Sequence, residues 1–105
     1  MNDLEFYNIT NSLMLSIENK IDEYNNKIDI ECEINNDVMY ISFKNNSKII
    51  INRQKFLKQI WLATQINGYH FNYLNKCWIC NRTGLNFWKI LEISCSSQSG
   101  YKIIF

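Results

Sequence analysis

Carboxylate side chains are concentrated at one end of this sequence. Nine of the ten acidic residues lie within residues 1–37, which contain only two basic residues. Residues 38–105 hold nine basic residues and a single acid, Glu92. The formal net charge of +1 therefore conceals balances of −7 and +8 in the two segments. Carboxylates gathered without histidine favour hard cations or a basic partner. Because like charges placed close together are destabilising, their clustering suggests such a purpose.

The acidic residues follow two different sequence periods. Some lie on the flank of a helical stripe, and others alternate with isoleucine and cysteine as on a half-buried strand. We expect these two groups to form one ridge, made of Glu18, Asp22, Glu23, Asp29, Glu31 and Glu33. Strand residues two apart project about 6.5–7 Å from one another, which favours several weak, hydrated cation sites over one closed cage. The alternative interpretation is a solvated face that only keeps the protein soluble.

Cysteine and histidine offer weaker candidates for chemistry. Cys77 and Cys80 have the spacing of a redox pair, but such pairs work at a helix N-terminus. Residues 77–80 look like a strand, where positions three apart face opposite sides, so we interpret both as buried or incidental thiols. A second cysteine pair with zinc-ribbon spacing is missing. His70 has no accompanying nucleophile or carboxylate motif, and we interpret it as a surface or interface residue.

An aromatic residue on a predicted strand is the second functional signal. If Ile60 and Leu62 point into the core, Gln59 and Trp61 point to solvent. A large exposed aromatic side chain often anchors a protein interface, although packing under a loop or the chain end would also explain it. Basic and aromatic side chains on this sheet could bind single-stranded nucleic acid. We do not expect a nucleic-acid partner, because no signature motif is present and the acidic segment would repel phosphate.

Local patterns predict two helices around a run of short strands. Apolar residues spaced by three and four indicate a first helix over residues 4–24, capped by Asn2 or Asp3. Alternation and asparagine-rich turns then indicate strands at 28–34, 38–43, 48–52, 57–63, 69–73 and 77–80. A second helix begins at Asn81 or Thr83 and runs to about Ser97, and we expect the apolar residues 101–105 to dock on the fold.

These elements predict an α+β fold. Short hairpin turns require an antiparallel meander, because parallel neighbours need long crossovers. The predicted architecture is a two-layer α/β sandwich, in which N- and C-terminal helices cover one face of an antiparallel sheet of five to six strands. A length of 105 residues predicts one domain, 1–105. The acidic start lacks the basic region of a signal peptide and no apolar run reaches the roughly 20 residues of a membrane helix, so we expect a cytoplasmic protein with no membrane partner.

Several longer motifs resemble the frataxin family over essentially the whole chain. They are SKIIINRQ at 47–54, QIWLAT at 59–64, GYHF at 68–71, WICNRTG at 78–84, FW at 87–88, DLEF at 3–6 and IECEIN at 30–35. The resemblance implies a frataxin-like fold and a non-enzymatic role in iron–sulfur cluster assembly. It implies weak binding of ferrous or ferric iron, and regulation of the cysteine desulfurase IscS with the scaffold IscU in the same complex.

The resemblance also implies roles for particular residues. The positions that match the iron-binding ridge of the family and remain acidic here are Asp3, Glu18, Asp22, Glu23, Asp29, Glu31 and Glu33. The positions that match the partner-contacting sheet face are Asn52, Gln59 and Trp61. Asn19, Asn25 and Lys27 stand where acids are common in bacterial members, so this ridge is thinner.

Two hypotheses follow from the thinner ridge. The first is an iron-binding regulator, and possible iron donor, of the desulfurase and scaffold complex. The second is an interaction module of the same complex with little or no iron affinity. Under both hypotheses we expect the protein to be a monomer.

Overall fold

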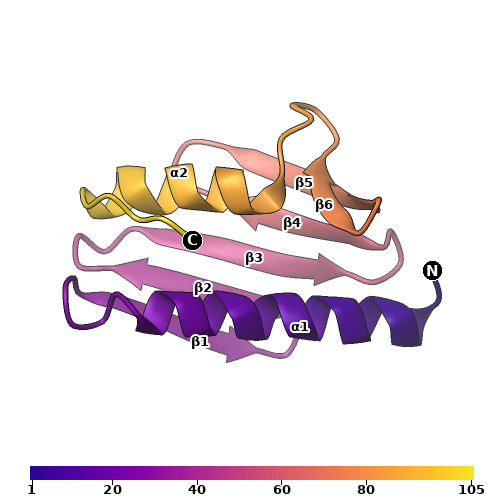
Figure 1. The fold of residues 1–105 in the computed structure, drawn as a ribbon, viewed down its shortest axis with the longest axis horizontal. Helices are drawn as coiled ribbons and strands as arrows, with labels where there is room; N and C mark the ends of the chain where they lie inside the picture. Colours follow the sequence, from indigo (N-terminus) through magenta and orange to yellow (C-terminus); the bar gives the residue numbers. More distant parts are fainter.

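The computed structural model describes residues 1–105 as two helices and six strands. The elements follow one another as α1 Asp3–Asp22, β1 Ile30–Asn35, β2 Val38–Phe43, β3 Lys48–Gln54, β4 Gln59–Ala63, β5 Gly68–Leu74, β6 Cys77–Cys80 and α2 Phe87–Ser99. The strands form one antiparallel sheet in the order of the sequence, β1 to β6. Both helices lie side by side over the same face of this sheet (Figure 1). The predicted two-layer α/β sandwich is therefore confirmed.

Alternation along the strands divides the sheet into two faces. The face under the helices carries the buried residues, including Met39, Ile41, Ile51 and Phe71, which are all fully buried. The opposite face, which we call the outer face, has no helix over it (Figure 1). Cross-strand partners share a face, so the pairing of Asn52 with Trp61 places both on the outer face.

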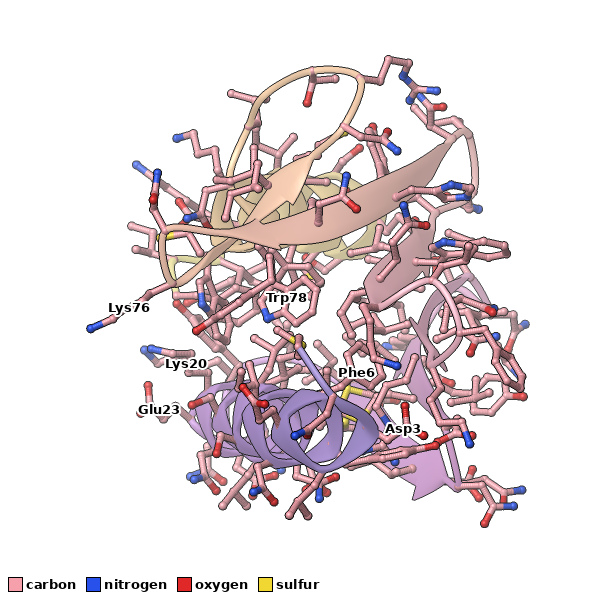
Figure 2. The ribbon with its side chains drawn as sticks, turned by 90° about the vertical axis from the view of Figure 1, so that its right-hand side faces the viewer. Asp3, Phe6, Lys20, Glu23, Lys76 and Trp78 are labelled. Carbon is pink, nitrogen blue, oxygen red and sulfur yellow. The ribbon has the colours of Figure 1, made fainter.

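The core lies between the helices and the sheet. Phe6, Ile17 and Ile21 of α1 are fully buried, as the apolar stripe of the first helix predicted. Figure 2, a view along α1, shows Phe6 and Trp78 pointing toward each other between α1 and β6. Their ring centroids are 6.2 Å apart in an edge-to-face arrangement, which is favourable for aromatic pairs. The core thus joins the first helix to the last strand.

The ends of several elements differ from the predictions. Asn2 caps α1 and, with Glu5, forms a capping box, but the helix ends at Asp22 instead of residue 24. The second helix begins at Phe87, capped by Asn86, and not at Asn81 or Thr83. The reason is a turn at Gly84, whose φ of 75° lies in the left-handed region and cannot continue into a helix. Lys58 also has a positive φ, so a turn delays β4 to residue 59.

The C-terminal residues dock on the helices as predicted. Ile103 is buried in the core. The hydroxyl of Tyr24 accepts a hydrogen bond from the backbone N–H of Ile104 at 2.9 Å and donates one to the carbonyl of the same residue at 3.0 Å. This contact ties the end of the chain to the end of α1. Neither helix is long and apolar enough to cross a membrane.

Arg53 connects α1 to the sheet from the end of β3. Its guanidinium, with only 10% of the side chain exposed, forms an ion pair with Asp37 at 3.3 Å and donates to the carbonyl of Asn36 at 3.0 Å. It also donates to the side-chain oxygen of Asn11 on α1. The guanidinium lies over the ring of Tyr7 at 4.9 Å, a cation–π contact. One side chain therefore holds the first helix and the β1–β2 turn together.

Candidate functional site

The end of α1 and the edge strand β1 form an acidic groove. The groove measures about 490 Å³, and its lining includes the carboxylates of Asp22, Asp29, Glu31 and Glu33. Glu18 lies one helical turn before Asp22, so both carboxylates are on the same side of α1. This side faces β1, since both negative charges contribute to raising the pKa of the Cys32 thiol on that strand. We call this set of five carboxylates the acidic strip, made of Glu18, Asp22, Asp29, Glu31 and Glu33. The helix and strand acids thus lie together around one edge of the sheet.

The thiol of Cys32 lies half-buried within the same groove. Burial, together with the negative charges of Glu18 and Asp22, raises the pKa of Cys32 to about 12. The thiol is therefore neutral at pH 7 and adds no negative charge to the groove. Carboxylate oxygens are the anionic groups of this site, and they are the ligands that hard cations prefer.

The acidic strip is open and does not form a cage. No group of three or more His, Cys, Asp or Glu side chains is arranged so as to hold a metal ion. The ion pairs of the chain involve only Asp3 and Asp37, so none of the five strip carboxylates is paired with a lysine or arginine. Unpaired and mostly exposed carboxylates create a negative potential that concentrates cations without fixing their position.

Two acids expected in the ridge lie away from the strip. Asp3 is at the opposite end of α1, roughly 22 Å from Glu18 at 1.5 Å per residue. Its carboxylate accepts from Lys58 Nζ at 2.6 Å and lies 3.9 Å from Lys55 Nζ. The hydrogen bond from Lys58 lowers the pKa of Asp3. Glu23, which caps the C-terminus of α1, points to the side of the helix turned away from the sheet (Figure 2).

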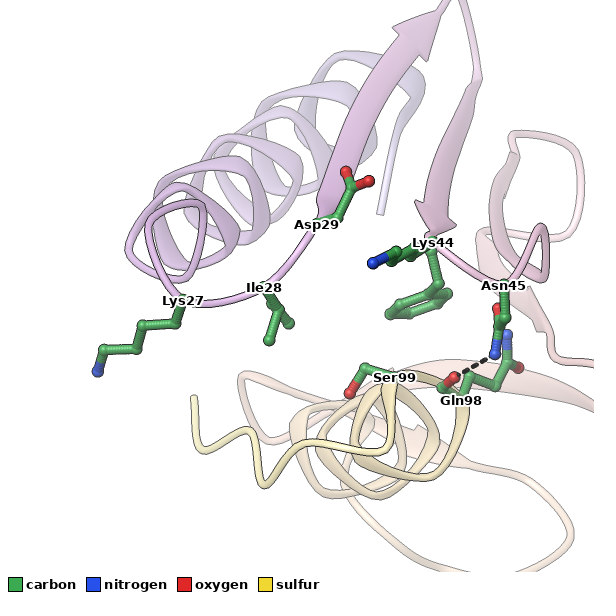
Figure 3. A pocket seen from close by; sticks show the side chains of 8 residues that line it. Lys27, Ile28, Asp29, Lys44, Asn45, Gln98 and Ser99 are labelled. Atoms are coloured by element: carbon green, nitrogen blue, oxygen red, sulfur yellow. Dashed lines mark hydrogen bonds between the residues drawn. The ribbon is translucent and has the colours of Figure 1, made fainter.

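A second groove borders the strip at Asp29. It measures about 620 Å³ and lies between the segment before β1, the β2–β3 turn and the end of α2. Figure 3 shows Lys27 extending away from this groove and Lys44 extending into it. The dashed bond in Figure 3 joins Asn45 Nδ2 to the carbonyl of Gln98 at 2.8 Å and holds the turn against α2. Asp29 therefore lies between the other carboxylates of the acidic strip and the basic residues Lys27 and Lys44.

The outer face of the sheet brings together the three residues expected to contact a partner. Asn52 and Trp61 are direct cross-strand neighbours, and Gln59 lies on the same face two residues before Trp61. Trp61 Nε1 donates to Gln59 Oε1 at 2.8 Å, and Gln59 Nε2 donates to Asn72 Oδ1 at 3.0 Å. The indole is thus held in one orientation by a short chain of hydrogen bonds.

His70 is a further member of this surface, and its pairing with Trp61 was not among the predictions from the sequence. The two rings stack with centroids 4.1 Å apart and an interplanar angle of 6°. His70 pairs with Trp61 across the β4–β5 hairpin, and the stack leaves Trp61 half-buried instead of fully exposed. The signal was present in the sequence, because residues 61 and 70 are equidistant from the centre of the turn at 64–67.

Cys77 and Cys80 lie on opposite faces of β6, as their spacing predicted. Cys77 is exposed and Cys80 is buried on the helix side, and all four cysteines of the chain are free thiols. Although burial opposes ionisation, hydrogen bonds from Thr83 and the backbone of Arg82 lower the pKa of Cys80. The two sulfur atoms do not share a site, which supports their interpretation as incidental thiols.

These environments predict an order of reactivity. At pH 7.5 we expect iodoacetamide to modify Cys77 first, because it is the exposed thiol. We expect Cys95 to react only after unfolding, since burial raises its pKa to about 12 and shields it. Mass spectrometry of timed samples checks the order. Modification of Cys95 in the native protein before Cys77 would contradict the placement of α2.

Comparison with known proteins gives the family of the chain. A family model described as a frataxin-like domain matches residues 1–101. The iron-sulfur cluster assembly protein CyaY of Buchnera aphidicola subsp. Acyrthosiphon pisum is 54% identical over 100 residues, which are 95% of this chain and 86% of the relative.

Solved structures agree with this match. The frataxin of Psychromonas ingrahamii, from the CyaY protein family, superposes with a TM-score of 0.91 at 38% identity, covering 99% of this chain and 97% of that one. The trimeric frataxin of Saccharomyces cerevisiae, complexed with ferrous, superposes with a TM-score of 0.70 at 26% identity, covering 91% and 86%. The chain therefore belongs to the frataxin-like domain family, as the motifs in its sequence predicted.

Proposed function

We propose that this protein takes part in iron–sulfur cluster assembly as a non-enzymatic regulator of the desulfurase IscS and the scaffold IscU. In this proposal the acidic strip binds iron weakly and meets basic side chains of the desulfurase, while Asn52, Gln59 and Trp61 contact the complex. The observation that carries the proposal is a set of five unpaired carboxylates around one sheet edge, next to an uncovered outer face. The relative in Buchnera aphidicola, an iron-sulfur cluster assembly protein, and the yeast frataxin complexed with ferrous support it.

Iron enters this proposal as cargo held loosely by carboxylate oxygens. Adjacent strand carboxylates such as Glu31 and Glu33 project about 6.5–7 Å from one another, too far apart to chelate a single ion together without water. Hydrated ions exchanging among several carboxylates would give weak binding and ready release. We do not include Asp3 in the proposed iron-binding set, because its carboxylate already forms ion pairs with Lys58 and Lys55. Glu23 contributes only to the general negative potential.

An iron titration tests the metal-binding part. We expect ferrous iron to broaden NMR signals of residues 18–33 and to raise the melting temperature, because only the folded strip concentrates the carboxylates. Replacing Asp22 and Glu31 with Asn and Gln should remove most of the broadening. The matched control is Asp3→Asn, which removes an acid of the same chain outside the strip. Equal broadening in the Asp22 and Glu31 variant would contradict iron binding at the strip.

The absence of a preformed chelate favours a second candidate function. No three ligands converge, and Lys27 and Lys44 lie beside Asp29 at one end of the strip. The protein would then be an interaction module that binds the desulfurase in a salt-sensitive manner but ignores iron. A cluster-assembly assay with IscS and IscU, run with and without this protein across iron concentrations, separates the two. An effect that is independent of iron favours the module, and no effect at all overturns both.

A further inference from the structure

A small hollow lies on the outer face beside the Trp61–His70 stack. It measures about 210 Å³, and its lining includes Ile50, Ala63 and Gly68 next to the two stacked rings. Engineered cavities of roughly 150 Å³ accept benzene, so this hollow has room for an aliphatic side chain. It does not belong to the acidic strip, and no helix lies over the outer face on which it opens (Figure 1).

The hollow exists because two small residues face each other across β4 and β5. Ala63 pairs with Gly68, and Ala63 also pairs with Ile50 on β3. A Cβ atom added at Gly68 would meet nothing within 4 Å, so the space above this residue is open. The stacked rings of Trp61 and His70, one residue pair further along the same face, form a wall. The result is an apolar floor with an aromatic side.

The hollow and the acidic strip lie on one row of the sheet. Glu33 pairs with Tyr40, and Tyr40 pairs with Ile50, the neighbour of Ala63. These partners share the outer face, and three strand spacings separate Glu33 from Ala63, which is about 14 Å. A single partner surface laid on the outer face would therefore meet the carboxylates and the hollow together.

The charges around the hollow define what can fill it. The only acid after residue 37 is Glu92, which lies on α2 in the other layer. Arg82 donates to the carbonyl of Gly68 at 3.0 Å at the end of β5, and Lys48 lies on the outer face of β3. A basic side chain would be repelled here while it would be attracted at Glu31 and Glu33. Because the floor is apolar, burying a charge of either sign there would be costly. The side chain that fits is therefore uncharged, on a surface that carries its positive charges about 14 Å away.

We propose that the hollow over Ala63 and Gly68 receives an aliphatic side chain of the protein partner that places its basic side chains on the acidic strip. This inference deepens the proposed function and rests on it. The amide side chain of Asn52 forms part of the polar rim, and the Trp61–His70 stack is the wall against which the inserted side chain packs. Filling an apolar pocket away from water contributes affinity, and the surrounding polar rim excludes solvent. The hollow thereby selects the docking partner by shape.

Filling the hollow from this side tests the inference. Ala63→Met and Gly68→Val each add volume above the floor, and Gly68 does not have the positive φ that would forbid a side chain. We expect each variant to bind the complex of IscS and IscU at least tenfold more weakly than the wild type, with an unchanged melting temperature and unchanged iron broadening. The matched control is Asn8→Leu, which adds apolar volume on an exposed position of α1. Wild-type affinity in both filled variants would overturn the inference.

Other outcomes separate this inference from the function on which it rests. If the wild type does not bind the complex at all, the proposed function and the hollow both fail. If the wild type binds and the filled variants bind equally well, only the hollow fails. Sedimentation of the protein alone measures self-association, and so tests whether a second copy of the chain fills the hollow. Self-association that Ala63→Met abolishes would assign the hollow to a homodimer and overturn the proposed partner.

Discussion

Replacing Arg53 with alanine is expected to lower the free energy of unfolding by about 2–4 kcal/mol. The guanidinium makes charge-assisted hydrogen bonds to Asp37, Asn36 and Asn11 and is almost fully buried. Such bonds contribute about 1.5–3 kcal/mol each, but the cost of burying the charge offsets part of the sum. Domains of this kind are stable by only about 5–15 kcal/mol in total, so the loss is large. Urea denaturation followed by circular dichroism measures it.

Two further variants identify the cause of that loss. Arg53→Lys keeps the positive charge but lacks the planar guanidinium group, whose several N–H donors reach three acceptors at once. We therefore expect a loss of stability between those of the wild type and Arg53→Ala. Lys55→Ala removes a more exposed basic side chain nearby and should leave stability nearly unchanged. If Arg53→Ala is as stable as the wild type, the guanidinium does not hold α1 to the sheet. If Arg53→Lys equals the wild type, charge alone suffices.

Reversing the charge of two strip residues is expected to weaken binding to the desulfurase about 100-fold at low salt. The double variant Glu31→Lys and Glu33→Lys places positive charges where the proposal requires pairing with basic partner side chains. Like charges facing each other across an interface cost several kcal/mol, which corresponds to this loss. Because exposed charges are screened beyond about 8–10 Å at physiological ionic strength, the difference should shrink as salt is added. Fluorescence anisotropy with labelled protein at several salt concentrations provides the measurement.

A control with the same change in net charge makes this result specific. Glu5→Lys and Glu92→Lys also reverse two acids, but both lie on the helices and outside the acidic strip. We expect that double variant to keep most of the affinity. Equal weakening in both double variants would mean that the overall charge of the protein, and not the strip, governs binding. The melting temperature of each variant confirms that it remains folded.

Local patterns in the sequence determined most of the architecture. The spacing of Phe6, Ile17 and Ile21 predicted the buried face of α1, and the alternation around Ile60 and Leu62 placed Gln59 and Trp61 on the opposite face of β4. These patterns are reliable because a helix and a strand repeat their side-chain directions every 3.6 and 2 residues. The segment boundaries were less accurate, since a single residue such as Gly84 decides where a turn ends.

Only the tertiary structure decided how the functional groups combine. The motifs match Asp3 to the iron-binding ridge of the family, but only the fold brings Lys58, 55 residues away in the sequence, to its carboxylate. Glu23 follows Asp22 in the sequence yet points away from the sheet, because adjacent helical residues differ by about 100° in direction. The hollow beside Trp61 depends on the register that sets Ala63 opposite Gly68. Residue periods describe one element at a time, whereas ion pairs, stacked rings and hollows arise where distant elements meet.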